Sequence, residues 1–414
     1  MTEIEVDIRA LGAQADGIAE IDGSTLYVPY VLPGERVRVA LEEGDRASLQ
    51  KIVTPSHERV SPPCRHFTRC GGCSLQHMAQ DAYGTWKREQ VEAALRARGL
   101  DIEVSPLVSA APRSRRRATF AVTRTKKGVT IGYYMRGSHD IVPLTECPLV
   151  IPEIANFVPK LGELVLPGLS RRTRASALVT WTLNGLDVAL SGGKPLDGPR
   201  RAELGQRAQA ADIARLSWDG EVVAERRVPE IDLSGLRVAL PVGGFLQPTG
   251  GGEGALVRLV REGVGHARRV VDLFAGCGTF SAALVENAAV HAVEGEKKAL
   301  AALDRAVRRQ GPELGLKPLT TEARDLARRP LLADELNKFD AIVIDPPRAG
   351  ALAQAEEIAK SDVPLVVSVS CNPATFARDA RALVDGGYRL ESVTPVDQFL
   401  WSAHVELVGI FRRS

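Results

Sequence analysis

Val271-Asp-Leu-Phe-Ala-Gly-Cys-Gly-Thr-Phe280 joins a run of strand-forming residues to a helix-forming stretch. Gly276 and Gly278 allow the backbone to turn tightly and to approach a ligand closely. The next strand-like run ends in Glu294, about 20 residues further on, where a carboxylate can accept hydrogen bonds from ribose hydroxyls. The third glycine of the dinucleotide fingerprint is missing, which argues against NAD. The stretch therefore predicts a nucleotide-like ligand other than NAD.

The pattern of one strand followed by one helix continues to the end of the chain. Such alternation predicts an α/β fold with a parallel sheet between helices. Asp325 follows the expected third strand and Asp345 follows the fourth. Ligands of open α/β sheets bind beyond the carboxyl ends of the strands, so we expect these acids to face the same crevice as Glu294. The helices are expected at Ser281–Glu286, Glu296–Arg309, Ala351–Lys360 and Ala374–Val384.

The composition changes along the chain in a way that predicts three domains. Short alternating runs and a Leu32-Pro-Gly-Glu35 turn indicate a small β-barrel of the OB type in residues 1–60, a fold that often binds nucleic acid. Residues 61–235 contain an expected helix at Tyr83–Arg98 and are then mostly β-like. The α/β domain takes residues 236–414.

Charge and hydropathy argue against a membrane protein, a secreted protein and a strongly basic nucleic-acid-binding protein. The chain has 414 residues and a net charge of only +2, so a nucleic-acid surface would have to come from local clusters of basic residues. No run reaches the ~18 apolar residues of a membrane span. The first residues lack the features of a signal peptide, so a cytoplasmic protein is expected.

Two basic clusters are candidate RNA contacts: Arg113, Arg115, Arg116, Arg117, Arg124, Lys126 and Lys127, and Arg171, Arg172 and Arg174.

Two reactive side chains are candidates for chemistry on a pyrimidine. Cys371 follows the expected fifth strand, and Glu406 lies in Ser402-Ala-His-Val-Glu406. Carbon 5 of uracil is a poor nucleophile until a thiolate adds to carbon 6, and a base must later remove the C5 proton. A cysteine and a carboxylate could supply these two functions. Taken alone, Cys371 is more typical of a small buried residue, and Glu406 of a solvated acid.

The motifs around these residues resemble those of the RNA 5-methyluridine methyltransferase family. The resemblance rests on Asp345-Pro-Pro-Arg-Ala-Gly350, Ser370-Cys371-Asn-Pro-Ala-Thr375 and Val396-Asp-Gln-Phe-Leu-Trp-Ser-Ala-His-Val-Glu406, and residues 271–280 are similar to motif I of class I methyltransferases. It implies that Cys371 is the nucleophile, that Glu406 is the base and that S-adenosylmethionine is the methyl donor. The implied cofactor contacts are Gln247, Phe274, Thr279, Glu294, Asp325 and Asp345.

The resemblance extends to the first domain, which is similar to a TRAM domain. It is not complete, because four places depart from the family pattern. Thr279 and Thr249 stand where the family has Asn, and Ser368 stands where Tyr is common. Leu400-Trp401 replaces a Pro and a Gln or His. The catalytic pair is intact, so the departures near the base bear on which RNA is recognised.

Four of the six cysteines have the spacing of a metal site. Cys64, Cys70 and Cys73 are clustered, and Cys147 lies far downstream. Four thiolates suit a [4Fe–4S] cluster or a structural zinc ion, and zinc sites more often have two short Cys-x-x-Cys pairs. The family resemblance implies the iron–sulfur cluster. Cys277, inside the glycine loop, is expected to be a packing residue.

Other functions remain as alternatives. An N-methyltransferase would share the glycine loop and the Asp-Pro-Pro motif, but it would carry an aromatic residue at the position of Arg348 and would need no cysteine. A cytosine-C5 methyltransferase would place its cysteine after Pro or Thr, whereas Cys371 follows Ser370. A non-catalytic RNA-binding protein would not need Cys371 and Glu406. A TRAM-like domain with a cluster loop resembles the 23S rRNA enzymes, so a monomer acting on 23S rRNA is expected, with tRNA as the alternative substrate.

Overall fold

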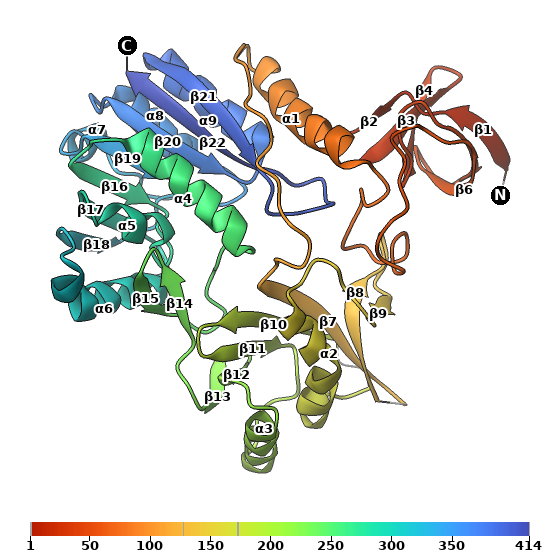
Figure 1. The fold of residues 1–414 in the computed structure, drawn as a ribbon, viewed down its shortest axis with the longest axis horizontal. Coiled ribbons are helices and arrows are strands. Elements are labelled where there is room, and N and C mark those ends of the chain that lie inside the picture. The colour runs from red at the N-terminus through yellow and green to blue at the C-terminus, as the bar shows by residue number, and fades with distance from the viewer. Residues whose placement is uncertain (1, 127, 172–173, 414) are drawn as a thin grey trace.

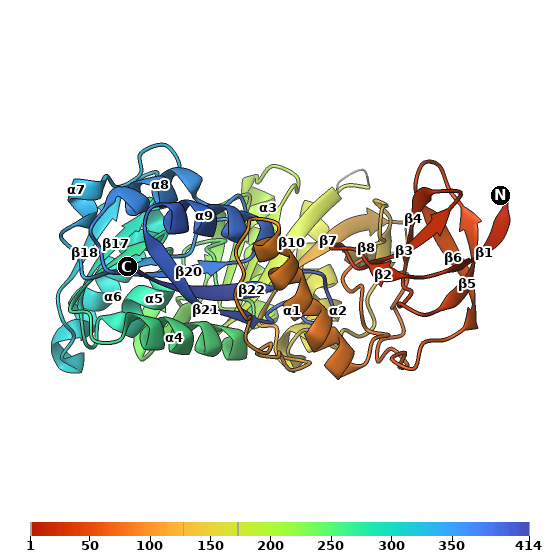
Figure 2. The same cartoon turned by 90° about the horizontal axis from the view of Figure 1, so that it is seen from above.

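The computed structural model describes residues 2–126, 128–171 and 174–413. They form three parts in a row, with the amino-terminal part at one end (Figures 1 and 2). Lys127 and Arg172 of the basic clusters lie outside the described residues. Every helix in the described ranges is too short or too polar to span a lipid bilayer.

The first part consists of two three-stranded sheets around a small apolar core. The strand orders are β1-β5-β6 and β2-β3-β4, and all pairs within them are antiparallel. Alternate residues such as Val37 and Val39 are buried while Arg36 and Arg38 are exposed, which is the pattern of a sheet with one solvated face. The bounds are β1 (Glu3–Asp7), β2 (Ala10–Leu11), β3 (Asp16–Ile21), β4 (Ser24–Pro29), β5 (Arg36–Leu41) and β6 (Ala47–Thr54).

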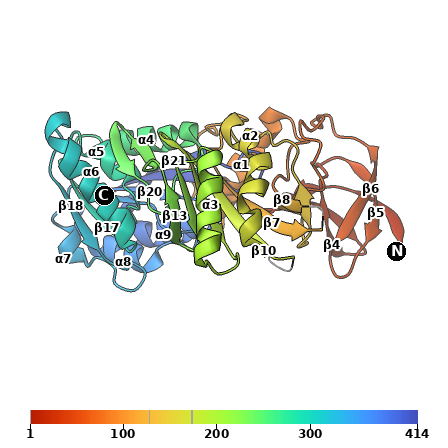
Figure 3. The same cartoon turned by 90° about the horizontal axis from the view of Figure 1, so that it is seen from below.

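The central part is a seven-stranded sheet with two helices and a 3₁₀ turn. Its strand order is β13-β12-β11-β10-β7-β8-β9, and Figure 3 shows α2 and α3 in front of it. The β-rich expectation is confirmed, but the two helices were not expected. Ile154, Phe157 and Leu161 recur at helical spacing and are buried, so a helical signal was present for α2. The bounds are β7 (Arg117–Thr125), β8 (Gly128–Tyr134), β9 (Ile141–Pro143), α2 (Pro152–Val165), η1 (Leu166–Gly168), β10 (Arg174–Thr182), β11 (Gly185–Ser191), α3 (Gly198–Ala210), β12 (Arg215–Trp218) and β13 (Glu221–Glu225).

The third part is the expected α/β fold. Its sheet has the order β18-β17-β16-β19-β20-β22-β21, in which the first five strands are parallel and β22 runs antiparallel to both of its neighbours, β20 and β21. Successive strand residues face opposite sides: Val270 packs with α4 and α5, and Val271 packs with α8 and α9. The bounds are β16 (Arg269–Leu273), α5 (Thr279–Leu284), β17 (Ala289–Glu294), α6 (Lys297–Leu314), β18 (Leu319–Ala323), α7 (Ala333–Leu336), β19 (Ala341–Ile344), α8 (Leu352–Lys360), β20 (Leu365–Ser370), α9 (Pro373–Asp385), β21 (Tyr388–Val396) and β22 (Glu406–Arg413), preceded by β14 (Glu230–Leu233), β15 (Leu236–Ala239) and α4 (Gly250–Val264).

Two segments tie the parts together. Helix α1 (Gln80–Arg96) belongs to the expected central domain, yet its Val91 and Leu95 lie in the core beneath α8 and α9. The chain after α1 adds backbone bridges from Val104 to Val393 and from Val108 to Val396. The hairpin β14–β15 spans the expected limit at 235 and packs against α6. The domain limits stay predictions.

Candidate active site

The sheet topology brings the candidate residues to one edge. Phe274, Asp345 and Cys371 directly follow β16, β19 and β20, and Glu294 is the last residue of β17. Strand β22 is antiparallel to β20, with Ser370 opposite Leu407. Its first residue, Glu406, therefore lies at the carboxyl edge of the parallel strands. This is how a carboxylate 35 positions after Cys371 (406 minus 371) reaches the same site.

One cavity of about 490 Å³ opens at this edge. Cys371 and Glu406 line it, together with four of the six predicted cofactor contacts. Thr279, the first residue of α5, and Asp325 are not among the lining residues, so their contacts with a cofactor stay predictions. The full lining is Phe245, Gln247, Phe274, Gly276, Cys277, Glu294, Glu296, Ala299, Asp345, Pro346, Pro347, Arg348, Cys371, Phe399 and Glu406.

The glycine loop allows other parts of the structure to pack closely against its backbone. Gly278 has φ +92°, and a Cβ there would lie 2.5 Å from Leu303 of α6, so only glycine lets the loop and the helix meet. Phe274 also has a positive φ, 62°, which is uncommon for a bulky residue and typical of functional loops. The Glu294 carboxylate accepts hydrogen bonds from the amides of Gly276 (2.9 Å) and Glu296 (2.7 Å). A carboxylate has about four lone-pair sites, so Glu294 can still accept from a ligand hydroxyl.

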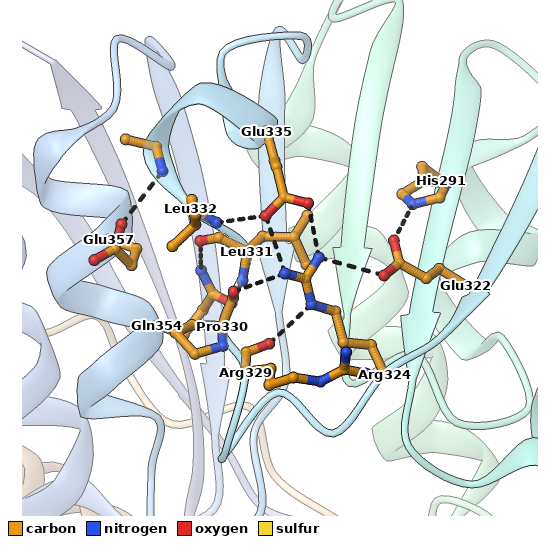
Figure 4. Close-up of polar contacts among 11 residues, drawn as sticks. His291, Glu322, Arg324, Arg329, Pro330, Leu331, Leu332, Glu335, Gln354 and Glu357 are labelled. Carbon is orange, nitrogen blue, oxygen red and sulfur yellow. Dashed lines mark hydrogen bonds and ion pairs between the residues drawn. The ribbon is translucent and has the colours of Figure 1, made fainter.

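Arg324 fixes the loop that follows β18 (Figure 4). Its guanidinium donates to both carboxylate oxygens of Glu335, at 2.8 and 3.0 Å, and to the carbonyls of Arg329 (2.9 Å) and Pro330 (3.1 Å). A planar fork bound in this way holds a loop in one conformation. The neighbouring Asp325 is exposed and accepts from the Ala327 amide at 3.1 Å. Asp325 is thus held at the strand end, as the sequence predicts, but outside the cavity lining.

The cavity concentrates acidic groups. Burial, and secondly the charge of Asp345, raise the pKa of Glu406 to about 8, while Lys87 lowers it. Burial and the nearby Asp272 raise the pKa of Asp345 to about 7. Burial, then Glu406 and Asp345, raise the pKa of the Cys371 thiol to about 11, against the opposing charge of Arg348. Several groups with shifted pKa values in one cleft are typical of an active site. A cationic ligand bound there would stabilise the ionised forms of these acids.

Two arginine–aromatic pairs were missed by sequence reasoning. The Arg117 guanidinium lies 5.5 Å from the centre of the Phe245 ring, and Arg115 lies 5.6 Å from that of Phe399. Both rings line the cavity, and Phe245 is 56% exposed. Other members of the same basic cluster make internal contacts: Arg116 pairs with Glu253 at 2.7 Å. Arg115 and Arg117 thus bring positive charge to the aromatic side chains that line the cavity.

Comparison with known proteins agrees with this geometry. Residues 241–413 match the family described as tRNA (Uracil-5-)-methyltransferase, and residues 2–50 match the TRAM domain. An uncharacterized RNA methyltransferase of Brucella suis is 48% identical, covering 99% of this chain and 98% of the relative. The 23S rRNA (uracil(1939)-C(5))-methyltransferase RlmD of Pectobacterium atrosepticum is 31% identical, covering 99% and 93%.

The chain belongs to the family of RNA uracil-5-methyltransferases. It is an S-adenosylmethionine-dependent enzyme with an amino-terminal TRAM domain, as its sequence predicts. The fold also matches the crystal structure of the Pyrococcus abyssi tRNA (uracil-54, C5)-methyltransferase in complex with S-adenosyl-L-homocysteine. That match has a TM-score of 0.75 and 23% identity, and it covers 98% of this chain and 99% of the other.

Two of the methyltransferase's four departures from the family pattern, Thr249 and Leu400-Trp401, make contacts that the structure shows. Thr249 caps α4 by accepting from the Gly252 amide at 3.0 Å, a function that Asn serves equally well. Leu400 is buried among Leu75 and Tyr83. The Trp401 carbonyl accepts from the amides of Ser74 (2.7 Å) and Leu75 (3.0 Å), next to Cys73. Leu400 and Trp401 therefore connect the segment before Glu406 to the cysteine-bearing loop, and their bearing on RNA recognition stays a prediction. Nothing in the structure explains Ser368 or Thr279.

The four predicted metal-ligating cysteines of the methyltransferase line a second, small cavity, which also includes Phe67 and Tyr133. All four are free thiols, and burial raises the pKa of Cys64 and Cys70, and that of Cys73 to about 12. Within residues 2–126, 128–171 and 174–413, no group of three or more His, Cys, Asp or Glu side chains is arranged to hold a metal ion. The thiols surround a space; they do not meet at one point.

Proposed function

We propose that this enzyme, as a monomer, transfers a methyl group from S-adenosylmethionine to C5 of a uridine in 23S rRNA through a covalent bond between Cys371 and C6. The observation that carries the proposal is the shared cavity. Cys371 and Glu406 line it from neighbouring strands, and Phe274 and Glu294 line it from the glycine-loop side. A uracil ring placed between the two groups of residues would present one face to the thiol and C5 to the donor.

S-adenosylmethionine supplies an electrophilic methyl group. The Cys371 thiolate forms a bond to C6, which opens the C5–C6 double bond to an enolate and makes C5 nucleophilic. C5 then takes the methyl group as the bond between that group and the donor sulfur breaks, which would leave S-adenosylhomocysteine. Glu406 removes the remaining C5 proton, the S–C6 bond breaks, and the double bond and the free thiolate return.

The charges in the cavity are consistent with this order of steps. The thiol has a high pKa in the free protein because Glu406 and Asp345 lie near it. A sulfonium ion and Arg348 would bring positive charge to the same place and favour the thiolate. Glu406, with a pKa of about 8, can both ionise and carry a proton near neutral pH, which suits a general base. We propose that Gln247, Thr279, Asp325 and Asp345 complete the cofactor site with Phe274 and Glu294.

The choice of 23S rRNA is supported by the relative that matches along nearly its full length and is named for that substrate. This substrate also implies a cytoplasmic enzyme. Mapping 5-methyluridine in total RNA from a strain that lacks the gene tests the assignment. Loss of one modification from 23S rRNA, restored by the wild-type gene, is the expected result. Loss from tRNA instead would assign the same chemistry to the alternative substrate.

We further propose that Cys64, Cys70, Cys73 and Cys147 hold a [4Fe–4S] cluster. The chemistry of the donor set supports a cluster: four cysteine thiols and no Lys or Arg side chain line the cavity, and such thiols lose their protons when they bind a cationic metal centre. A cluster would fill a space that four sulfurs surround. It would act structurally, because Cys371 and Glu406 do not line this cavity.

Protein purified without oxygen is expected to be brown and to contain about four iron atoms per chain, with broad absorption near ~400 nm. Removing the metal is expected to destabilise the cysteine loop, since metal-binding energy is partly folding energy. Metal analysis and limited proteolysis before and after chelation measure both effects. One zinc ion per chain with no iron would contradict the cluster and leave the methyltransferase assignment unchanged.

A further inference from the structure

Helix α1 delivers a fully buried ammonium group to the segment 397–405, which joins β21 to β22. Lys87 and Asp397 both have an exposure of 0%. The Lys87 Nζ donates to Asp397 Oδ1 at 2.7 Å, to the His404 carbonyl at 2.6 Å and to the Phe399 carbonyl at 3.3 Å. An ammonium has three N–H donors. All three are therefore used on this one segment, two near its start and one near its end.

The same segment forms part of the wall of the catalytic cavity. Phe399 lines that cavity, and Glu406 follows directly after the segment. Gln398 donates to the Gln247 side chain at 2.8 Å, which connects the segment to a proposed cofactor contact. A second anchor from α1 is Tyr83, whose hydroxyl donates to Asp397 Oδ2 at 2.7 Å and accepts from the Trp401 amide at 2.9 Å.

We propose that Lys87 is a positioning residue for uracil methylation, which holds the segment 397–405 against the cavity and keeps a positive charge beside Glu406. The inference rests on the proposed role of Glu406 as the base. Lys87 does not line the cavity, so it acts through Phe399 and Glu406 and does not touch the substrate. A lysine serves better here than an arginine, because its compact charge can reach three acceptors that surround one point.

The charge of Lys87 has a separate, measurable consequence. The groups that face Glu406 are Asp345 beyond β19, Cys371 beyond β20 and Lys87 from α1. Asp345 raises the pKa of Glu406, and Lys87 is the group that lowers it. Glu406 must be ionised to accept the C5 proton, so activity is lost as the pH falls through this pKa. Removing the Lys87 charge raises the pKa further and moves that loss to higher pH.

The test is the pH profile of methyl transfer by the full-length Lys87→Met variant. The activity of the wild-type enzyme is expected to fall below about pH 8, following Glu406. For Lys87→Met the fall should begin about one pH unit higher, with about a tenfold loss at pH 7.5 that is recovered above pH 9. The covalent adduct with 5-fluorouridine RNA should still form, because it does not require proton removal by Glu406.

Arg215→Met is the matched control. Arg215 forms a comparable buried ion pair with Asp187, at 2.7 and 2.9 Å, in the central sheet. It should lower stability without moving the pH profile. If Lys87→Met does not fold, Tyr83→Phe is the variant that decides, because it removes one anchor of the segment but keeps the Lys87 charge. A raised KM for RNA with an unchanged pH profile would support the inference. Wild-type kinetics in Tyr83→Phe would overturn it.

A wild-type pH profile and wild-type KM in Lys87→Met would also overturn the inference. This failure is distinguishable from failure of the proposed function. If Glu406→Gln is inactive while Lys87→Met behaves as wild type, only the Lys87 inference fails. If Glu406→Gln turns over normally, the base has been misassigned.

Discussion

Replacing Cys371 with alanine is expected to abolish methyl transfer while S-adenosylmethionine still binds. The thiolate supplies the electrons that make C5 nucleophilic. The other thiol in the cavity lining, Cys277, belongs to the glycine loop on the cofactor side, so we do not expect it to replace Cys371. Loss of a covalent nucleophile reduces turnover by several orders of magnitude. Transfer of labelled methyl groups to RNA measures the loss, and calorimetry with the cofactor measures the retained binding.

RNA that carries 5-fluorouridine provides the control for this variant. Its C5 fluorine cannot leave as a proton, so the wild-type enzyme should remain joined to the RNA after methylation. The adduct should be absent with Cys371→Ala and should survive denaturing electrophoresis with the wild type. Full activity in the alanine variant would exclude the covalent mechanism.

Replacing Glu406 with glutamine is expected to stop the reaction one step later. Addition of Cys371 and methylation of C5 do not need the Glu406 carboxylate, but removal of the C5 proton does. Loss of a general base reduces the rate by about 10²–10⁴-fold. The variant should therefore accumulate a methylated RNA–protein complex on ordinary uridine RNA.

Mass spectrometry of the complex checks its composition, which should be one RNA, one chain and one additional methyl group. The wild-type enzyme with the same RNA is the control and should show only a trace. Normal turnover of Glu406→Gln without a trapped complex would show that another group removes the proton.

The α/β part of the fold could be predicted because its signals are local. Val271 to Phe280 contains both the strand and the glycine turn, and the later βα units repeat the same periodicity. The expected helices lie within a few residues of α5, α6, α8 and α9. Helix α2 has buried residues at helical spacing, but it lies between strand-like runs, and periodicity over so short a stretch does not separate a helix from a strand.

The candidate site could be predicted only in part. The carboxyl ends of parallel strands meet at one edge, so the positions of Glu294, Asp345 and Cys371 follow from the sequence pattern. Glu406 does not follow from it. That residue begins a strand, and it reaches the same edge because β22 runs antiparallel to β20. Its proposed role came from family resemblance, and strand direction explains how it can fill that role.

By itself, the sequence determined the alternation of strands and helices in the α/β part and the position of the glycine loop, because each depends on neighbours within a few residues. Only the tertiary structure decided which buried charges meet. Lys87 and Asp397 are 310 positions apart. Nothing in the local pattern of α1 shows that one of its lysines is fully buried. The long-range packing of α1 against the segment before Glu406 removes both charges from water, and the pair is stable there because each satisfies the other.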